Sequence, residues 1–140
     1  RDYSHVAGYI FAGFPIKGSD TGDYVVRNLM GVDAENKLLA VGGYLNPGDT
    51  IMFCRRDIRT AYEDLLRMLR DIKSRLGGRP KGGVYYSCLG RGVHMFGADS
   101  AELRAIRQEL GDIPLVGFFA NGEISHNRLY GFTGVLTLFS

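Results

Sequence analysis

Apolar residues recur at helical spacing in one long segment, residues 58–76. Its apolar members, three or four positions apart, are Ile58, Ala61, Tyr62, Leu65, Leu69, Ile72 and Leu76. This spacing places them on one face of an amphipathic helix, with charged residues on the opposite face. Asp57 stands at the position of an N-cap, and Gly77-Gly78 follow as a helix stop signal. We therefore predict a long helix over residues 58–76.

A second helix is predicted over residues 100–110. Asp99 and Glu102 have the spacing of a capping box, and Gly111 follows the last apolar position. Runs rich in β-branched and aromatic residues predict strands at residues 5–14, 24–32, 38–45, 50–55, 83–88, 113–120 and 129–139. Turn residues separate these runs, most clearly in the segment Asn46-Pro47-Gly48-Asp49.

The order of these elements predicts the fold class. Strands and helices alternate from residue 50 to residue 120, which is typical of crossover connections between parallel strands. Hairpins on either side predict antiparallel edges. We expect an α/β (α+β) fold with a single mixed β-sheet of about six strands and two long helices on one face. No long polar stretch divides the chain, so we expect one domain over residues 1–140, with residues 1–23 the hardest to assign.

Composition narrows the class of protein. The 17 basic and 15 acidic residues give a net charge of +2, which argues against a nucleic-acid-binding surface. No apolar run approaches the roughly 20 residues that span a bilayer, and residues 1–20 have no secretory signal pattern. Cys54 and Cys88 are the only cysteines. We therefore expect free thiols, a reducing compartment and a cytoplasmic protein.

Three blocks of sequence resemble a known family. Residues 85–92 (Tyr-Tyr-Ser-Cys-Leu-Gly-Arg-Gly) with 95–97 (Met-Phe-Gly) form one block, residues 114–124 a second, and residues 26–33 a third. In this order they resemble the FIST C-terminal domain, of the F-box and intracellular signal transduction family. The resemblance implies a cytoplasmic sensory module that binds a small molecule, often suggested to be an amino acid.

The same resemblance implies a partner and two alternative functions. The family's C-terminal domain is usually paired with an N-terminal FIST domain of the same chain. Because the sequence begins at Arg1, we expect a fragment of a longer two-part sensory protein. Some relatives resemble haem-based nitric-oxide sensors, and some carry an F-box and recruit substrates for ubiquitination. A haem sensor and a protein-interaction module therefore remain alternatives, and the oligomeric state stays open.

The loop after the predicted strand 83–88 is the first candidate ligand site. Cys88, Gly90, Arg91 and Gly92 lie at the carboxyl end of this strand, where ligands bind in open parallel sheets. The glycines let backbone N–H groups converge, and Arg91 can bind a carboxylate or phosphate with two hydrogen bonds. The alternative is a tight turn with a solvated arginine.

Asn121 and Glu123 form the second candidate, after the predicted strand 113–120. If that strand is parallel to residues 83–88, both loops open at one sheet edge. Glu123 or Asn121 would then bind the amino end of a zwitterion whose acidic group is bound by Arg91. The alternative is a hairpin, because Asn121-Gly122 is a strong type I′ turn signal.

Other chemistry has weaker support. Cys88 lacks a general base at a fixed spacing, and position 94 is His where a phosphatase loop would carry Arg. No Walker A motif is present, and His5, His94 and His126 do not have zinc-motif spacing. His94, beside the glycine loop, is the candidate axial ligand if haem is bound. We expect a binding domain without a metal or cofactor rather than an enzyme.

Overall fold

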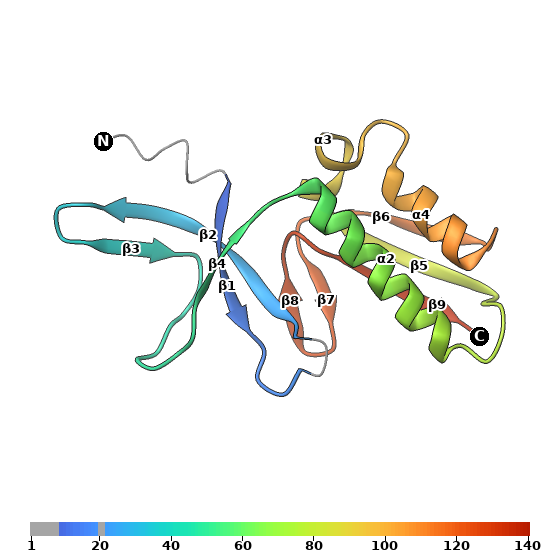
Figure 1. Cartoon of the computed structure of the whole chain (residues 1–140), viewed down its shortest axis with the longest axis horizontal. Coiled ribbons are helices and arrows are strands. Elements are labelled where there is room, and N and C mark those ends of the chain that lie inside the picture. The colour runs from blue at the N-terminus through green and yellow to red at the C-terminus, as the bar shows by residue number, and fades with distance from the viewer. Residues whose placement is uncertain (1–8, 20–21) are drawn as a thin grey trace. The chain divides into compact units, whose positions relative to one another are not determined.

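The computed structural model describes residues 9–19 and 22–140 (Figure 1). The chain divides into two compact units, Arg1–Arg56 and Asp57–Ser140, called here the N-terminal and C-terminal units. Cys54 and Cys88 are both free thiols.

The N-terminal unit is an antiparallel sheet. Its described strands are β1 (Ile10–Pro15), β2 (Tyr24–Asp33), β3 (Leu38–Val41) and β4 (Met52–Arg55), in the order β3-β2-β1-β4. β1 pairs with both β2 and β4, and its residues Phe11 and Ala12 are buried. Gly13 has no side chain where a Cβ atom would press against the Cys54 sulfur and Met52. β1 therefore has a paired strand on each side and contributes buried side chains to this unit.

The C-terminal unit contains the helices and a mixed sheet. Its elements are α2 (Ile58–Arg75), β5 (Gly82–Cys88), η1 (Leu89–Arg91), α3 (Val93–Phe96), α4 (Ala101–Leu110), β6 (Leu115–Ala120), β7 (Glu123–Ser125), β8 (Arg128–Tyr130) and β9 (Gly134–Phe139). β5 is the central strand, parallel to β6 and antiparallel to β9. β7 and β8 form a separate antiparallel pair. α4 connects the two parallel strands as a crossover helix.

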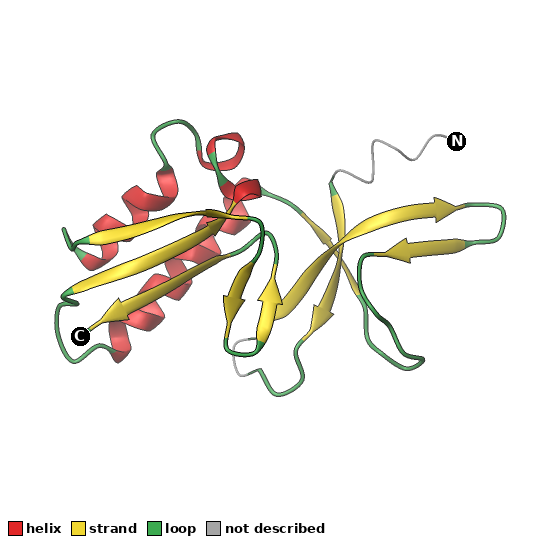
Figure 2. Ribbon diagram, turned by 180° about the vertical axis from the view of Figure 1, so that it is seen from behind, coloured by secondary structure: helices red, strands yellow, loops and turns green. Residues whose placement is uncertain are grey.

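Both long helices lie on one face of the mixed sheet (Figure 2). The buried core between helices and sheet consists of Leu65, Leu69, Tyr85, Ala105, Ile106 and Leu110. The Asp57 carboxylate caps α2 by accepting a hydrogen bond from the Thr60 N–H, as predicted. Among the described residues, no helix combines the length and the apolar character needed to cross a membrane.

The strands of the mixed sheet have two different faces. Side chains alternate along β5, so Tyr85 and Ser87 point toward the helices while Tyr86 points away. Register places Phe118 beside Tyr86, and their rings meet edge to face at 5.0 Å between centroids. The face away from the helices, called here the outer face, carries the exposed apolar residues Val116, Phe118 and Phe139.

The α/β class is confirmed, but the prediction of a single mixed sheet is wrong. The described strands belong to three sheets. β4 pairs with β1 in the antiparallel sheet, so the connection through α2 does not return to the sheet that β4 left. The second predicted crossover, from β5 through α4 to β6, is confirmed as parallel. Strand and helix type were thus predictable, whereas the assignment of β4 to a sheet depended on its long-range partner.

Three local predictions also need correction. Ser100, not Asp99, caps α4, since its Oγ accepts a hydrogen bond from the Leu103 N–H. The predicted last strand is divided into β8 and β9, because Phe132 adopts a positive φ of 60° between them. Asn121-Gly122 leads into β7, which pairs with β8 and not with β6. His5 and the start of the predicted first strand lie outside the described residues.

We predict that Gly117→Ala destabilises the C-terminal unit by about 1–3 kcal/mol. A Cβ atom at Gly117 would collide with the Tyr85 backbone, which pairs with it across β5 and β6. Urea unfolding followed by circular dichroism measures the change. Gly77→Ala is the matched control, because a Cβ atom at Gly77 meets no heavy atom within 4 Å. Equal stability of the two variants would contradict the prediction.

Candidate functional site

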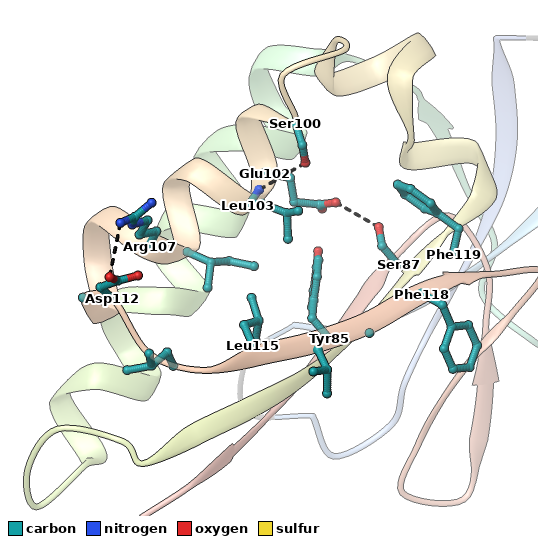
Figure 3. Close-up of a pocket in the computed structure, with 15 residues that line it drawn as sticks. Tyr85, Ser87, Ser100, Glu102, Leu103, Arg107, Asp112, Leu115, Phe118 and Phe119 are labelled. Atoms are coloured by element: carbon teal, nitrogen blue, oxygen red, sulfur yellow. Dashed lines mark hydrogen bonds and ion pairs between the residues drawn. The ribbon is translucent and has the colours of Figure 1, made fainter.

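A buried polar cluster lies between β5 and α4. Glu102 is its centre, with only 2% of the residue exposed. Its Oε1 atom accepts hydrogen bonds from Arg91 Nε at 2.8 Å and Nη2 at 2.6 Å, and its Oε2 atom accepts one from Ser87 Oγ at 2.9 Å. Figure 3 shows Ser87 and Tyr85 rising from β5 toward Glu102. These four residues, Tyr85, Ser87, Arg91 and Glu102, are called here the Glu102 cluster.

Local structure explains why the cluster forms. Alternation along β5 places Tyr85 and Ser87 on the same side, facing the helices. Glu102 lies in the first turn of α4, where the helix dipole favours a negative charge. The chain after β5 turns through η1, which ends at Arg91. The elements β5, η1 and α4 therefore each contribute polar side chains to the Glu102 cluster.

Arg91 is held on two sides. Its side chain is 11% exposed and forms an ion pair with Glu102. Its guanidinium carbon also lies 5.0 Å from the centre of the Phe96 ring, within the range of a cation–π interaction. The sequence predicts Arg91 to be a free anion-binding group. The structure gives it an internal partner instead, and ligand binding by Arg91 stays a prediction.

Tyr85 is the least satisfied member of the cluster. The residue is 4% exposed, and its hydroxyl makes no hydrogen bond of good geometry to any described residue. Burial raises the pKa of Tyr85 far above its ordinary value, and the negative charge of Glu102 adds to this effect. Tyr85 therefore keeps its proton and presents a neutral hydroxyl beside a carboxylate.

A cavity of about 560 Å³ lies between α4 and β6 and borders the Glu102 cluster (Figure 3). Tyr85, Ser87 and Glu102 form the polar part of its wall. Its apolar wall includes Leu103, Ile106, Ile113 and Leu115, and Ser100, Arg107 and Asp112 also line it. Such a mixture of apolar walls with a few polar groups is typical of small-molecule sites.

Glu123 is a second buried carboxylate in the C-terminal unit. It is 1% exposed, and neither oxygen makes a hydrogen bond of good geometry to a described residue. Burial raises the pKa of Glu123, while the backbone N–H groups of Thr133 and Gly122 and the charge of Arg91 lower it in part. Arg91 follows β5 and Glu123 follows β6, and these strands end side by side at Cys88 and Ala120, so both residues lie near the same end of the sheet, as the sequence predicted.

The predicted site residues take different places. The ends of β5 and β6 lie side by side, because Cys88 pairs with Ala120. Asn121 and Glu123 consequently follow β6 at the same sheet edge as the loop with Gly90 and Gly92. Cys88 itself is buried, and none of these residues lines the cavity. Their role in ligand binding stays a prediction.

The cavity and most of its polar wall do not follow from the sequence. The sequence pattern predicts a helix-capping role for Glu102, and Tyr85 and Ser87 are parts of a family block. One signal was available: Tyr85 and Ser87 carry hydroxyl groups at alternate positions of a strand predicted to lie between two helices. Their partner Glu102 was not predictable, because the contact depends on how α4 packs on the sheet.

A histidine-ligated haem does not fit this cavity. As far as the described residues define it, the cavity lining contains no histidine, cysteine or methionine. His94, the residue proposed as an axial ligand, is exposed on α3. In residues 9–19 and 22–140, no group of three or more His, Cys, Asp or Glu side chains is arranged to hold a metal ion.

Comparison with known protein families shows to which family the chain belongs. A model of the FIST C domain matches residues 3–126, most of the chain and parts of both compact units. The chain belongs to the FIST C domain family. This match confirms the resemblance found in the sequence. The FIST C domain is a sensory-type domain of signal transduction.

Similar proteins occur in mycobacteria. An uncharacterized protein of Mycobacterium tuberculosis is 39% identical over 122 residues, which cover 84% of this FIST C chain and 32% of the relative. An uncharacterized protein of Mycobacterium bovis is 38% identical over the same shares. The chain thus spans about a third of the length of these curated relatives. No solved structure matches it.

We predict that Glu102→Gln destabilises the C-terminal unit by about 3 kcal/mol, because it leaves the Arg91 charge buried without a counter-charge. Chemical denaturation measures the loss. The double variant Arg91→Met with Glu102→Leu should lose less than the sum of its single changes, since it removes both charges together. Arg59→Ala, which breaks an exposed ion pair with Glu63, is the control and should change stability by less than about 0.5 kcal/mol. Additive single changes would refute the coupling.

We predict a pH-dependent effect for Glu123→Gln. The folded pKa of Glu123 is raised, so the wild type loses stability as the pH rises from the ordinary carboxyl pKa through this raised value. Glutamine carries no charge, so the variant should be equal to the wild type in acid and more stable by about 1–3 kcal/mol at neutral pH. Urea unfolding of both proteins between pH 4 and pH 8 measures the difference.

The exposed carboxylate Glu63 provides the control for this prediction. Glu63→Gln should differ from the wild type by less than about 0.5 kcal/mol at each pH. A difference for Glu123→Gln that stays constant from pH 4 to pH 8 would show that ionisation of Glu123 does not oppose folding.

Proposed function

We propose that this FIST C domain is a sensory domain that binds a small molecule in the cavity between α4 and β6. The observation that carries the proposal is the buried Glu102 cluster on the wall of an otherwise largely apolar cavity. Its volume of about 560 Å³ is within the usual range for ligand pockets. The polar groups, which an ion pair and a hydrogen bond hold in place, orient the ligand. Burial of the ligand's apolar part against the apolar walls provides the affinity.

An amino acid is the finer proposal for the ligand. Arg107 lines the cavity and has an exposed side chain, so it is more available for a ligand carboxylate than Arg91 is. Its partner Asp112 lies 3.3 Å away and can bind the ammonium group of the same ligand. The amino-acid side chain would then lie between Ile106 and Leu115.

The proposal is for binding without catalysis. Cys88, the nucleophile considered from the sequence, is buried and does not line the cavity. The carboxylate of Glu102 already accepts three hydrogen bonds from the protein. A cytoplasmic location and an N-terminal FIST domain of the same longer chain as the signalling partner are part of this proposal.

A second candidate function is protein interaction. The observation in its favour is the exposed apolar outer face, where Val116 and Phe118 are 67% and 64% exposed. Large exposed apolar patches are typical of interaction surfaces. The ligand screen below separates the two candidates, because an interaction module needs no small molecule in the cavity.

We predict that at least one of the twenty amino acids raises the midpoint of thermal unfolding. At a concentration a hundred times its dissociation constant, a ligand stabilises the folded state by about 2.7 kcal/mol, or several degrees for a domain of this size. Leu103→Trp, which adds bulk to the cavity wall, should abolish the shift. Differential scanning fluorimetry measures it.

The control is Ile124→Trp, which adds the same side chain at an exposed position on β7. This variant should keep the full shift. If no amino acid stabilises the wild type, the amino-acid proposal is wrong. If an amino acid stabilises Leu103→Trp as strongly as the wild type, the ligand does not occupy this cavity.

A further inference from the structure

We propose that β6 pairs antiparallel with β6 of a second copy of this chain, so that two C-terminal units form one continuous sheet. The inference goes beyond the proposed function, because this pairing needs no ligand. Four features of β6 carry it: its free edge, its exposed apolar side chains, the direction of its backbone groups and its lack of charge.

β6 is an edge strand without the usual protection. Of the described strands, only β5 pairs with it, and Figure 1 shows β6 at the margin of the three-stranded sheet. Natural edge strands usually carry charged residues, prolines or bulges, because their free N–H and C=O groups attract other strands. β6 has the sequence Leu-Val-Gly-Phe-Phe-Ala, and its register with β5 is unbroken. Its edge is therefore suited to pairing with a further strand.

Exposed apolar side chains accompany this free edge. Val116, Phe118 and Phe119 are 67%, 64% and 51% exposed. Residues 115–119 all line the cavity, although alternate side chains of a strand point to opposite faces, as Figure 3 shows for Phe118 and Phe119. The cavity therefore opens along the edge of β6. A strand that paired with β6 would lie along this opening and bury apolar surface.

The backbone groups of β6 that are free to pair recur at every second residue. The Pro114 carbonyl accepts a hydrogen bond from the Gly83 N–H at 2.9 Å, so it points toward β5. Successive residues of a strand direct their backbone groups to opposite edges, and those of Val116 and Phe118 consequently also point toward β5. The groups that point to the free edge are those of Leu115, Gly117 and Phe119. This set is symmetric about Gly117.

A second copy of the same strand matches this symmetry. Antiparallel pairing about a two-fold axis at Gly117 places the free backbone groups of the two copies opposite one another. It also places Val116 of one copy opposite Phe118 of the other on the outer face. An aromatic residue opposite a β-branched one is a favourable cross-strand pair. Residues 114–122 carry no charge, so no like charges face one another in this arrangement.

Symmetry favours β6 over β9 as the partner strand. β9 is the other edge of the same sheet. Pairing β6 of one copy with β9 of the next would leave a free edge at each end, and such contacts add copies without closing. Pairing of β6 with β6 closes after two copies, and two-fold dimers are the commonest oligomers. It also uses the edge with more exposed apolar residues, since from β9 only Phe139 is strongly exposed.

Analytical ultracentrifugation of the 140-residue chain tests the pairing. Between about 1 and 100 µM, we expect a shift from the 15.5 kDa monomer to a dimer of twice that mass. Val116→Lys should weaken dimerisation by about tenfold or more, because it places a charge in a strand pair that buries Val116 beside Phe118 of the other copy.

Ile124→Lys is the matched control, because it adds the same charge at an apolar residue of β7 that is 70% exposed. It should dimerise like the wild type. Unchanged far-ultraviolet circular dichroism checks that each variant is folded before the measurement.

Cysteine cross-linking tests the register. Val116 and Phe118 of opposite copies would form a non-hydrogen-bonded pair with Cα atoms about 4.5 Å apart, within the range of a disulfide. Identical residues of the two copies would be diagonal neighbours about 7–8 Å apart, too far to bridge. A mixture of Val116→Cys and Phe118→Cys chains should therefore form a covalent dimer under mild oxidation, in far higher yield than either variant alone. Non-reducing electrophoresis measures the yield, with the wild type as the background from Cys54 and Cys88.

Three results would overturn the inference. A chain that stays monomeric at every concentration does not pair with itself, and its β6 edge is then available to another polypeptide. A dimer that Val116→Lys does not weaken forms through another surface. A mixture that cross-links no better than its single variants has another register. None of these results bears on ligand binding, which the thermal-unfolding screen tests separately.

Discussion

The ion pair between Arg91 and Glu102 is the interaction on which the candidate site depends. Both side chains are nearly or fully buried, and a charge taken out of water costs several kcal/mol unless it is paired and hydrogen-bonded. The pair meets this requirement with two hydrogen bonds to one carboxylate oxygen, and Ser87 supplies a third to the other. Because the three residues belong to η1, α4 and β5, the pair fixes the start of α4 over the carboxyl end of β5.

This pairing also decides the chemistry of the cavity. A free arginine would attract carboxylates and phosphates, as the sequence suggested for Arg91. A paired arginine leaves Glu102 on the cavity wall with its negative charge compensated. The negative charge of Glu123 is less well compensated than that of Glu102. It lies near a guanidinium that is already paired, and burial raises its pKa. The C-terminal unit therefore contains two buried carboxylates that differ in how well they are compensated.

Membership of the FIST C domain family relates the cavity and the outer face to a sensory-type domain. A sensory domain needs a ligand site and a surface that transmits occupancy. The cavity adjoins α4 and β6, and β6 also carries Val116 and Phe118 on the exposed outer face. A ligand that contacts β6 from the cavity side therefore touches the same strand that presents apolar side chains to the outside. The relatives, of which this chain covers about a third, contain further sequence outside the matched part.

The sequence by itself determined the local elements and the family. The apolar stripe from Ile58 to Leu76, the Asp57 cap and the parallel crossover from β5 to β6 follow from spacing and turn chemistry, which act over short distances. Tertiary structure decided the rest. β4 belongs to the antiparallel sheet because it pairs with β1. Arg91 pairs with Glu102, eleven positions away in the sequence, and the cavity lies where α4 packs beside β6. Each of these depends on contacts between residues distant in sequence, and the pattern of a single segment does not contain them.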